Sequence, residues 1–460
     1  MSLPAPLGSS SVKLPQALAD VGDLLSQSLS GAERVSRIVA DLKGFSHLDD
    51  TGETPVDLNA ELERTLNVLS HKVHQTVLGS GEGDLLAGWR KTSDAEVAFT
   101  TFDSNPLQDR LFREASLKET DYGVGFLIDN RPTSQIAALF EPLDAHQKQD
   151  AIEDFADIAP GLVQGMTVDG KLIGIPVRHA TQGLFYNEAL LEEAGITAPP
   201  TTLEELIQQA KTCTFTSKAG TPVVGMVLAS DLAVFPVMFA RAFGGDFISA
   251  DLKLVPNREA MESALSTLRG MFEAGSLPRS YATTKNDDHV TWMQQGRAAF
   301  TLLPFARSGQ LNSTEQSKYP GKIKAIAFPG SATLGGKVAM ASVVEAWAMA
   351  IPKNAKDKAL AWSFIKEVSS KRVTLGMAVN GNGPVRVSTY ADEALKAKNP
   401  LAAVEAKVLA TARGAFPPFP EAARAQATFL EEVQLAVLGR KPVKDAVSAI
   451  IERIKPMMPA

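Results

Sequence analysis

The residues best suited to chemistry in this chain are the neighbouring acids Asp287 and Asp288 and the histidine that follows them, His289. Such a group could bind a metal ion or transfer a proton. The surrounding sequence predicts a helix, on which consecutive side chains point about 100° apart, so these three cannot converge on one ion. We therefore expect a solvated helix start here and no metal site.

Other catalytic patterns are missing from the sequence. It contains no G-x-S-x-G, H-E-x-x-H or G-x-x-x-x-G-K-[ST] motif, and the stretch GSGEGD at residues 79–84 lacks the lysine of a phosphate-binding loop. Cys213 is the single cysteine, which excludes an internal disulfide and predicts a small buried side chain. The chain is predicted not to be an enzyme and to need no cofactor.

The composition is that of a folded protein with more than one domain. Of the 460 residues, 45% are hydrophobic and 21% are charged, which is enough for two or three domains. The net charge of -6 argues against a nucleic-acid partner. No apolar run reaches the length of about 18 residues that a membrane span needs, and the N-terminus shows no secretory signal.

The elements that would position a binding site are clearest between residues 172 and 214. The strand-like runs LIGIP and GLFY precede a helix that Asn187 can cap and that Gly195 can end, since glycine readily adopts the left-handed conformation found after helices. Two prolines then precede a second helix, for which Thr202 is the predicted N-cap.

This order of motifs resembles the bacterial extracellular solute-binding proteins of ABC importers, sugar-binding type. The matching stretches are Gly174-Ile175-Pro176, Tyr186-Asn187, Gly195-Ile196, Thr202 with Glu205, LFEPLD at 139–144, MQQGRAAF at 293–300, EAWAMAIP at 345–352 and GNGPVRVSTY at 381–390. The resemblance implies an α/β, periplasmic-binding-protein-like type II fold, in which crossing strands at a hinge join two lobes.

The N-terminal part of the chain resembles something else, a fragment of a sensor histidine kinase, through ERVSRIVADLKGFSHLDD at 33–50 and PVDLNAELERTLNVL at 55–69. We expect residues 1–74 to be a helical remnant of such a kinase, including a helix that Asn59 caps and that runs to about residue 73. None of the six histidines is followed by Glu or Asp, so no phosphate transfer is expected.

The solute-binding domain is then expected over residues 75–458, with the join near 70–76. Its first strand is predicted within residues 75–78 and the next over 95–102. The resemblance places lobe 1 at about 75–178 and 298–352, and lobe 2 at about 185–297 and 353–458.

A cleft that binds a polar solute needs flat rings and planar hydrogen-bonding groups. From their positions at strand ends and on crossing segments, the predicted ligand-binding residues are Phe102, Asp103, Asn130, Arg178, His179, Gln182, Tyr186, Phe305, Arg307, Trp347, Asn380 and Asn382. Core packing is the alternative for each aromatic residue. Trp347 is predicted to stack on the ligand, because strand alternation puts it on the bulky face of EAWAMAIP.

The predicted function is capture of a small polar solute, a sugar or oligosaccharide, by lobe closure and its delivery to ABC permease membrane subunits. The alternatives are a kinase-type signalling protein with a solute-binding detector, and a non-functional fusion. The resemblance implies the periplasm, whereas the N-terminus as written predicts a chain that stays in the cytoplasm.

Overall fold

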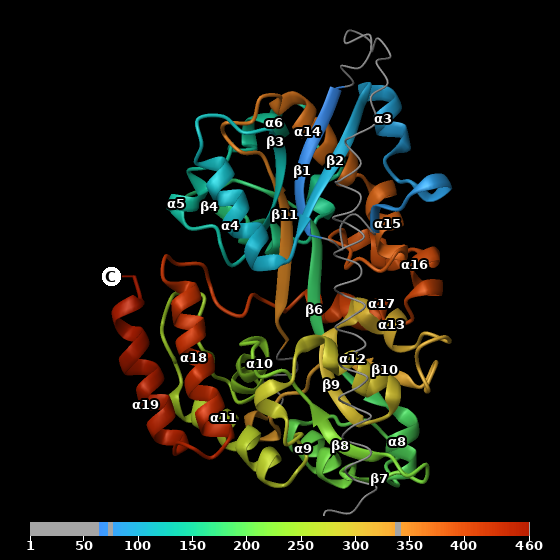
Figure 1. The fold of residues 1–460 in the computed structure, drawn as a ribbon, viewed down its shortest axis with the longest axis vertical. Helices are drawn as coiled ribbons and strands as arrows, with labels where there is room; N and C mark the ends of the chain where they lie inside the picture. Colours follow the sequence, from blue (N-terminus) through green and yellow to red (C-terminus); the bar gives the residue numbers. More distant parts are fainter. Residues whose placement is uncertain (1–63, 72–76, 336–341, 460) are drawn as a thin grey trace, which may run out of the picture. The chain divides into compact units, whose positions relative to one another are not determined.

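The computed structural model describes residues 64–71, 77–335 and 342–459, which belong to one compact unit that begins at Glu63 (Figure 1). The predictions for residues 1–63, including most of the kinase-like segment, lie outside the described residues.

The described strands are β1 (Arg64–His71), β2 (Ala95–Phe102), β3 (Tyr122–Ile128), β4 (Thr167–Val168), β5 (Lys171–Leu172), β6 (Ile175–Asn187), β7 (Phe215–Thr216), β8 (Pro222–Val227), β9 (Ala298–Pro304), β10 (Ile323–Ile326) and β11 (Val344–Ala350). The α-helices are α3 (Ala87–Ser93), α4 (Ser104–Ala115), α5 (Ser134–Ala137), α6 (Asp144–Gln149), α7 (Pro160–Gly165), α8 (Glu188–Glu193), α9 (Leu203–Thr212), α10 (Val234–Ala242), α11 (Arg258–Glu273), α12 (Asn286–Gln295), α13 (Ser308–Leu311), α14 (Lys358–Val368), α15 (Lys371–Val379), α16 (Glu393–Lys398), α17 (Ala402–Leu409), α18 (Ala422–Val437) and α19 (Val443–Ile454). Short 3-10 helices are η1 (Gly81–Gly83), η2 (Phe155–Asp157), η3 (Tyr281–Thr283), η4 (Phe305–Arg307), η5 (Ala332–Leu334), η6 (Val387–Ala391) and η7 (Lys455–Met457).

One long strand, β6, belongs to both halves of a sheet whose order is β2-β1-β3-β11-β6-β9-β8-β7. The first part of β6 pairs with β11 up to Thr181, and from Gln182 onward β6 pairs with β9. Strand β10 also pairs with this second part of β6. The chain therefore passes from one lobe to the other within a single strand.

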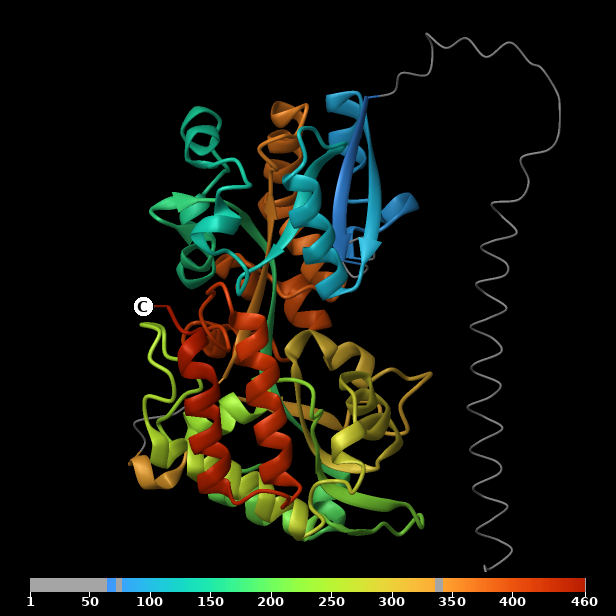
Figure 2. The same cartoon turned by 60° about the vertical axis from the view of Figure 1, so that its left-hand side comes forward.

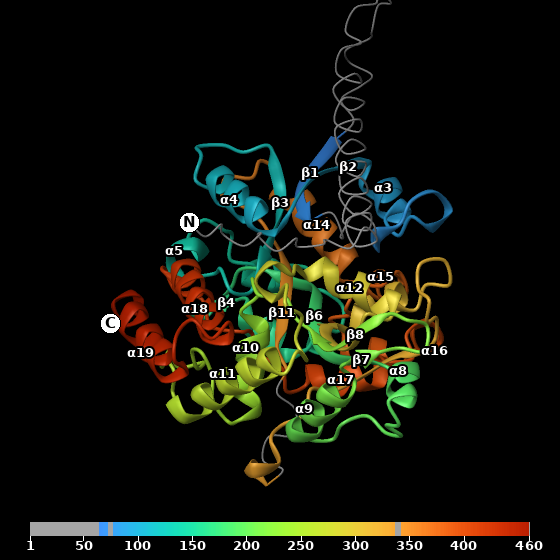
Figure 3. The ribbon, with the colours of Figure 1, turned by 60° about the horizontal axis from the view of Figure 1, so that its bottom comes forward.

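Each lobe has its own hydrophobic core. The core of lobe 1 is built around β1, β3 and β11 and includes the buried faces of α14 and α15. The main core of lobe 2 includes buried residues of α10 and α11 together with α18 and α19, and Figures 2 and 3 show these last two helices beside α11. Three segments connect the lobes, namely β6, β11 and the chain between α17 and α18.

Local sequence signals explain where several helices begin. The Asn187 side chain accepts hydrogen bonds from the first backbone N–H groups of α8, and Thr202 and Asn257 cap α9 and α11 in the same way. Gly195, just past α8, has a φ of 78°, the left-handed conformation predicted for it. The predicted caps Asn187 and Thr202 are confirmed.

The predicted start of the binding domain was wrong. Residues 64–71 form strand β1, not part of a helix capped by Asn59, and β1 lies between β2 and β3 in parallel register. Residues 77–78 are helical, so the strand predicted within 75–78 is not formed there. The central strand of lobe 1 is thus present, but it comes from the stretch that resembled a kinase.

The predicted lobe boundaries also need correction. Residues 298–304 form β9, which pairs with β6 and β8 in lobe 2, and residues 323–326 pair there too. Helices α14 and α15, predicted in lobe 2, pack in the core of lobe 1. Lobe 1 therefore comprises residues 64 to about 180 and 344 to about 409, and lobe 2 comprises most of the remaining described residues.

Candidate functional site

A cleft of about 840 Å³ lies where the crossing strands join the two lobes. Its lining comes from β6 and β11, from the segment after β9, and from the ends of α15 and α16. Both lobes contribute residues, so the cleft is placed where a relative movement of the lobes would change its width.

Strand register explains which side chains face this cleft. Arg178 pairs with Trp347 and Ala180 with Glu345 across β6 and β11, so these four lie on one face. Gln182 follows two residues later on the same face of β6 and lines the cleft as well. Its partner on β9 is Pro304, which brings the following η4 segment with Arg307 to the cleft.

Several polar atoms in the cleft have no hydrogen-bond partner among the described residues. They are Arg178 Nε, Gln182 Oε1 and Asn382 Oδ1. The amide nitrogen of Asn382 donates to the carbonyl oxygen of Val177 at 3.0 Å, which fixes the side chain and leaves its oxygen available. One unpaired donor and two unpaired acceptors suit a ligand with hydroxyl groups.

Burial and two charged neighbours, Glu345 and Arg307, act on the pKa of Arg178. Burial lowers the pKa of Arg178, the Glu345 carboxylate raises it, and Arg307 lowers it again, with a net decrease. No described acidic side chain lies within ion-pairing distance of the Arg178 guanidinium. Glu345 instead accepts a hydrogen bond from Trp347 Nε1 at 2.9 Å.

Comparison with known proteins identifies the family. Residues 123–374 match the family described as bacterial extracellular solute-binding proteins. The chain belongs to this family. A probable ABC transporter-binding protein of Deinococcus radiodurans is 27% identical over 51% of this chain and 56% of its own length. The arabinooligosaccharide-binding protein of Bacillus subtilis is 24% identical over 67% of this chain and 77% of its own length.

Solved structures agree on the fold. Maltose-bound MalE3 of T. maritima has a TM-score of 0.73 and 23% identity, over 85% of this chain and 99% of that one. A solute-binding protein of Agrobacterium radiobacter in complex with ribitol has a TM-score of 0.73 and 24% identity, over 85% of this chain and 98% of that one. UgpB of Mycobacterium tuberculosis in complex with glycerophosphocholine has a TM-score of 0.71 and 18% identity, over 88% of this chain and 98% of that one. The fold is thus the two-lobed binding-protein fold that the sequence predicted, and the family is not enzymatic.

Seven of the predicted ligand-binding residues of this solute-binding protein line the cleft, and five do not. The seven are Arg178, Gln182, Phe305, Arg307, Trp347, Asn380 and Asn382. Their role in binding stays a prediction. What the structure adds is that they share one cleft although they span more than two hundred positions of the chain.

Two of the aromatic side chains at the cleft are buried. Trp347 is 1% exposed and belongs to the core of lobe 1, so the open stacking platform predicted for it is not present in this conformation. Phe305 is fully buried, with its ring against Gly183 and 6.2 Å from the ring of Phe185. Both residues therefore belong to the closely packed part of the cleft wall.

His179 was wrongly predicted to face the cleft. It lies next to Arg178 on a strand, where consecutive side chains point to opposite faces. Its ring is buried behind the crossing strands, with Nε2 2.7 Å from the Tyr390 hydroxyl and Nδ1 accepting from Thr181 Oγ1 at 2.9 Å. Burial lowers the pKa of His179 to about 3, which keeps the imidazole neutral.

The other four predicted residues lie outside the lining of the cleft. Phe102 ends β2 and Asp103 precedes α4, whose first residue Ser104 does reach the cleft. Asn130 follows β3 in a turn. Tyr186 pairs with β9 and β10 near the end of β6 and packs against the core of lobe 2.

Sequence reasoning missed other cleft residues, notably Glu345, Lys398 and Asn399. Glu345 could have been found, because it lies two residues before Trp347 and therefore on the same face of the strand. Lys398 and Asn399 come from the end of the short helix α16, and no local sequence pattern indicates that this end reaches the cleft.

The group Asp287, Asp288 and His289 does begin a helix, α12, as predicted, but His289 is not solvated. Its ring is buried, with Nδ1 3.0 Å from Thr301 Oγ1. Asp288 accepts a hydrogen bond from the backbone of Lys285, and Asp287 is exposed. The three side chains therefore have separate environments.

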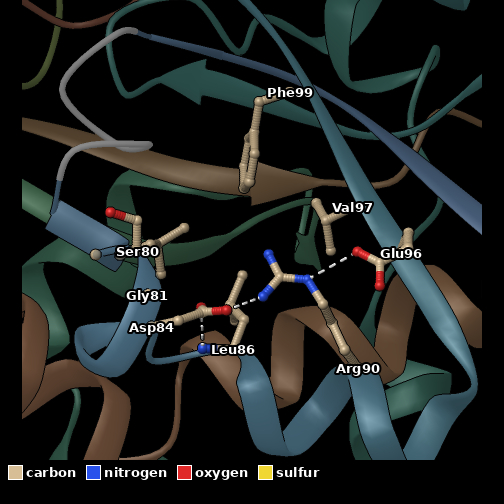
Figure 4. Close-up of a pocket in the computed structure, with 10 residues that line it drawn as sticks. Ser80, Gly81, Asp84, Leu86, Arg90, Glu96, Val97 and Phe99 are labelled. Atoms are coloured by element: carbon tan, nitrogen blue, oxygen red, sulfur yellow. Dashed lines mark hydrogen bonds and ion pairs between the residues drawn. The ribbon is translucent and has the colours of Figure 1, made fainter.

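A second cavity, of about 350 Å³, lies in lobe 1 between the turn after residue 78 and β2 (Figure 4). Its charged residue Arg90 is already held by Asp84 and by Glu96, the latter at 3.1 Å. Because its ionic groups already pair with one another, this cavity leaves fewer unpaired groups for a ligand than the cleft does. No helix in the described part of the chain is long and apolar enough to cross a membrane.

Proposed function

We propose that this protein captures a sugar, a polyol or a short oligosaccharide in the cleft between its lobes and delivers it to the membrane subunits of an ABC importer. The observation that carries the proposal is the set of unpaired polar atoms on the crossing strands, Arg178 Nε, Gln182 Oε1 and Asn382 Oδ1. Hydroxyl groups can both donate and accept, so a polyhydroxylated solute would satisfy all three.

The comparisons support this choice of solute. Structures with the same fold contain maltose, D-mannitol and ribitol, and one relative is named for arabinooligosaccharide binding. Delivery to an ABC permease is supported by the Deinococcus relative, which is named as a probable ABC transporter-binding protein. The family description supports a location outside the cytoplasmic membrane, in the periplasm or the extracellular space.

Lobe closure is the expected mechanism. Each lobe keeps its own core, and the lobes meet through three connecting segments, so they can rotate toward each other without loss of core packing. Closure would bring the η4 segment of lobe 2 toward Arg178 and Asn382 and bury the solute. Buried polar groups that are left unpaired by a wrong solute would then oppose binding.

A thermal-shift screen against mono- and oligosaccharides and polyols tests the proposal. A solute present at about 100 times its Kd should add about 2.7 kcal/mol to the free energy of unfolding. The change Gln182→Ala removes a cleft acceptor, and a tenfold loss of affinity would remove about half of this added stability. The matched change Gln208→Ala, on the exposed surface of α9, should preserve it. A screen in which no sugar or polyol stabilises the protein would contradict the proposal.

A further inference from the structure

The cleft carries an excess of positive charge in a protein whose net charge is -6. Three basic residues line it, namely Arg178, Arg307 and Lys398, whereas Glu345 is the single acidic residue among the lining residues described. Arg178 and Arg307 are partly exposed, and Lys398 lies exposed at the rim. The local charge therefore has the opposite sign to that of the whole chain.

The one carboxylate at the cleft does not neutralise this charge. Glu345 sits on β11 opposite Ala180, diagonal to Arg178, and one of its oxygens accepts from Trp347 Nε1. It is close enough to raise the pKa of Arg178 but does not form an ion pair within 4.0 Å of it among the described residues. Arg307 contacts Asp287 at 3.6 Å, but Asp287 is exposed, and such surface pairs contribute little.

Two buried arginines elsewhere in the described residues have hydrogen-bond acceptors within the protein. The guanidinium of Arg386 donates to the carbonyl oxygens of Ser369 and Glu153, at 2.8 and 2.7 Å, and pairs with Asp157. Arg241 donates to Asp246 at 3.2 Å and to the carbonyl oxygen of Gly414 at 2.7 Å. In both of these residues the buried guanidinium has carboxylate and carbonyl acceptors.

Arg178 has no such acceptors. No hydrogen bond from its guanidinium to a described residue is present, and its Nε lies buried without a partner. A buried donor atom such as this Nε is costly to leave unpaired, even in a side chain that is partly exposed, unless another molecule supplies the acceptor. Its position on the cleft face of β6 leaves the bound solute as that molecule.

We propose that the solute carries a negatively charged group, a carboxylate or a phosphate, which binds between Arg178 and Arg307 with Lys398 at the entrance. The inference rests on the proposed function and narrows it to acidic or phosphorylated sugars and polyols. A planar guanidinium presents paired N–H donors that match the oxygens of a carboxylate or phosphate. The acceptors Gln182 Oε1 and Asn382 Oδ1 remain for the hydroxyl groups of the same molecule.

Calorimetric titration with matched solutes tests this inference. The panel pairs each neutral compound with its charged derivatives, such as D-glucose with D-glucuronate and D-glucose 6-phosphate, and ribitol with ribitol 5-phosphate. We expect the tightest binder to be anionic, to exceed its neutral counterpart at least about tenfold, and to weaken as salt is added. Whether the carboxylate or the phosphate compound binds tells which group the site accepts.

Three variants locate the effect. Arg178→Gln should weaken binding of the anionic solute at least about tenfold and that of its neutral counterpart much less. Arg307→Gln provides a second cleft variant at a more exposed position, in case the first does not fold. Arg424→Gln changes an exposed arginine on α18 and should have no effect.

If a neutral sugar binds tightest, or if the preference for the charged solute survives both cleft variants, the inference is wrong while the proposed function stands. If no member of the panel binds, both fail.

Discussion

Two neighbouring residues on β6 show how the site is built at the scale of single side chains. Arg178 faces the cleft, and its Nε has no hydrogen-bond partner in the described part of the chain, whereas His179 faces the opposite side and has a partner at each ring nitrogen. A list of polar residues near a hinge cannot separate the two. Strand alternation separates them, once the strand and its register are known.

Trp347 is expected to act through stability more than through contact with solute. Its side chain is 1% exposed within the core of lobe 1, so Trp347→Ala should leave a cavity and lower the free energy of unfolding by about 3–5 kcal/mol. Denaturant unfolding and calorimetry on the same variant measure the two effects separately. Unchanged stability together with a loss of affinity would instead show that the indole stacks on the solute.

Glu405, on α17, should make the protein less stable as the pH rises. Burial raises the pKa of Glu405 to about 8, and the described residues offer its carboxylate a single hydrogen bond, from Asn399 at 3.3 Å. Unfolded chains lose this proton near pH 4.5, so between about pH 4.5 and 8 the folded state binds more protons and the carboxyl opposes folding increasingly.

The variant Glu405→Gln removes this titration. Its stability relative to the parent should rise with pH across that window, with a slope of at most about 1.4 kcal/mol per pH unit, as followed by chemical denaturation at several pH values. A constant difference between the two proteins from pH 5 to 8 would show that Glu405 does not titrate there.

At the scale of elements, β1 decides where the folded domain begins. The strand lies between β2 and β3, and its residues Leu66, Val68 and Leu69 are buried. A variant lacking residues 1–62 should therefore keep its thermal stability and its binding. A variant lacking residues 1–74 loses the strand and should not fold, because β2 and β3 lose their shared partner and the core loses its centre.

Circular dichroism melting and a binding assay on the two truncated proteins measure this difference. Equal stability of both truncations would mean that β1 is dispensable and that the fold of lobe 1 has been misassigned.

The sequence predicted helices well and this strand badly for a physical reason. Helix starts depend on local chemistry, so the caps Asn187 and Thr202 could be recognised from the residues around them. The run TLNVLSH fits a helix face through Leu62, Leu66 and Leu69 and also fits a buried strand. The run forms a strand because it pairs with β2 and β3, which lie more than twenty residues away in the sequence.

The lobe boundaries were misjudged for a related reason. A chain that crosses the hinge three times gives no local sign of which lobe it has entered. The strand after residue 298 looks the same from sequence whether it extends lobe 1 or lobe 2, and its pairing with β6 and β8 settles the question. The cleft itself was predictable in outline, because seven of the predicted residues reach it, but two of its four charged residues, Glu345 and Lys398, were not predicted.

At the scale of the whole molecule, two independent cores flank a polar cleft that is lined from both sides. This arrangement suits the capture of a solute, since the cleft places hydrogen-bonding groups at the hinge between the two cores. It also predicts that capture of a solute moves the lobes together. The central claim is therefore that the cleft on the crossing strands is where the solute binds.

Isothermal titration of the best solute from the screen into three proteins tests that claim most directly. The parent protein and Gln208→Ala should bind it with the same affinity. Gln182→Ala, which loses one acceptor on the cleft face of β6, should bind it at least about tenfold more weakly, since one hydrogen bond to a buried ligand is worth about 0.5–1.5 kcal/mol and an unpaired ligand hydroxyl costs more. Equal affinity in all three proteins would place the solute elsewhere and contradict the account.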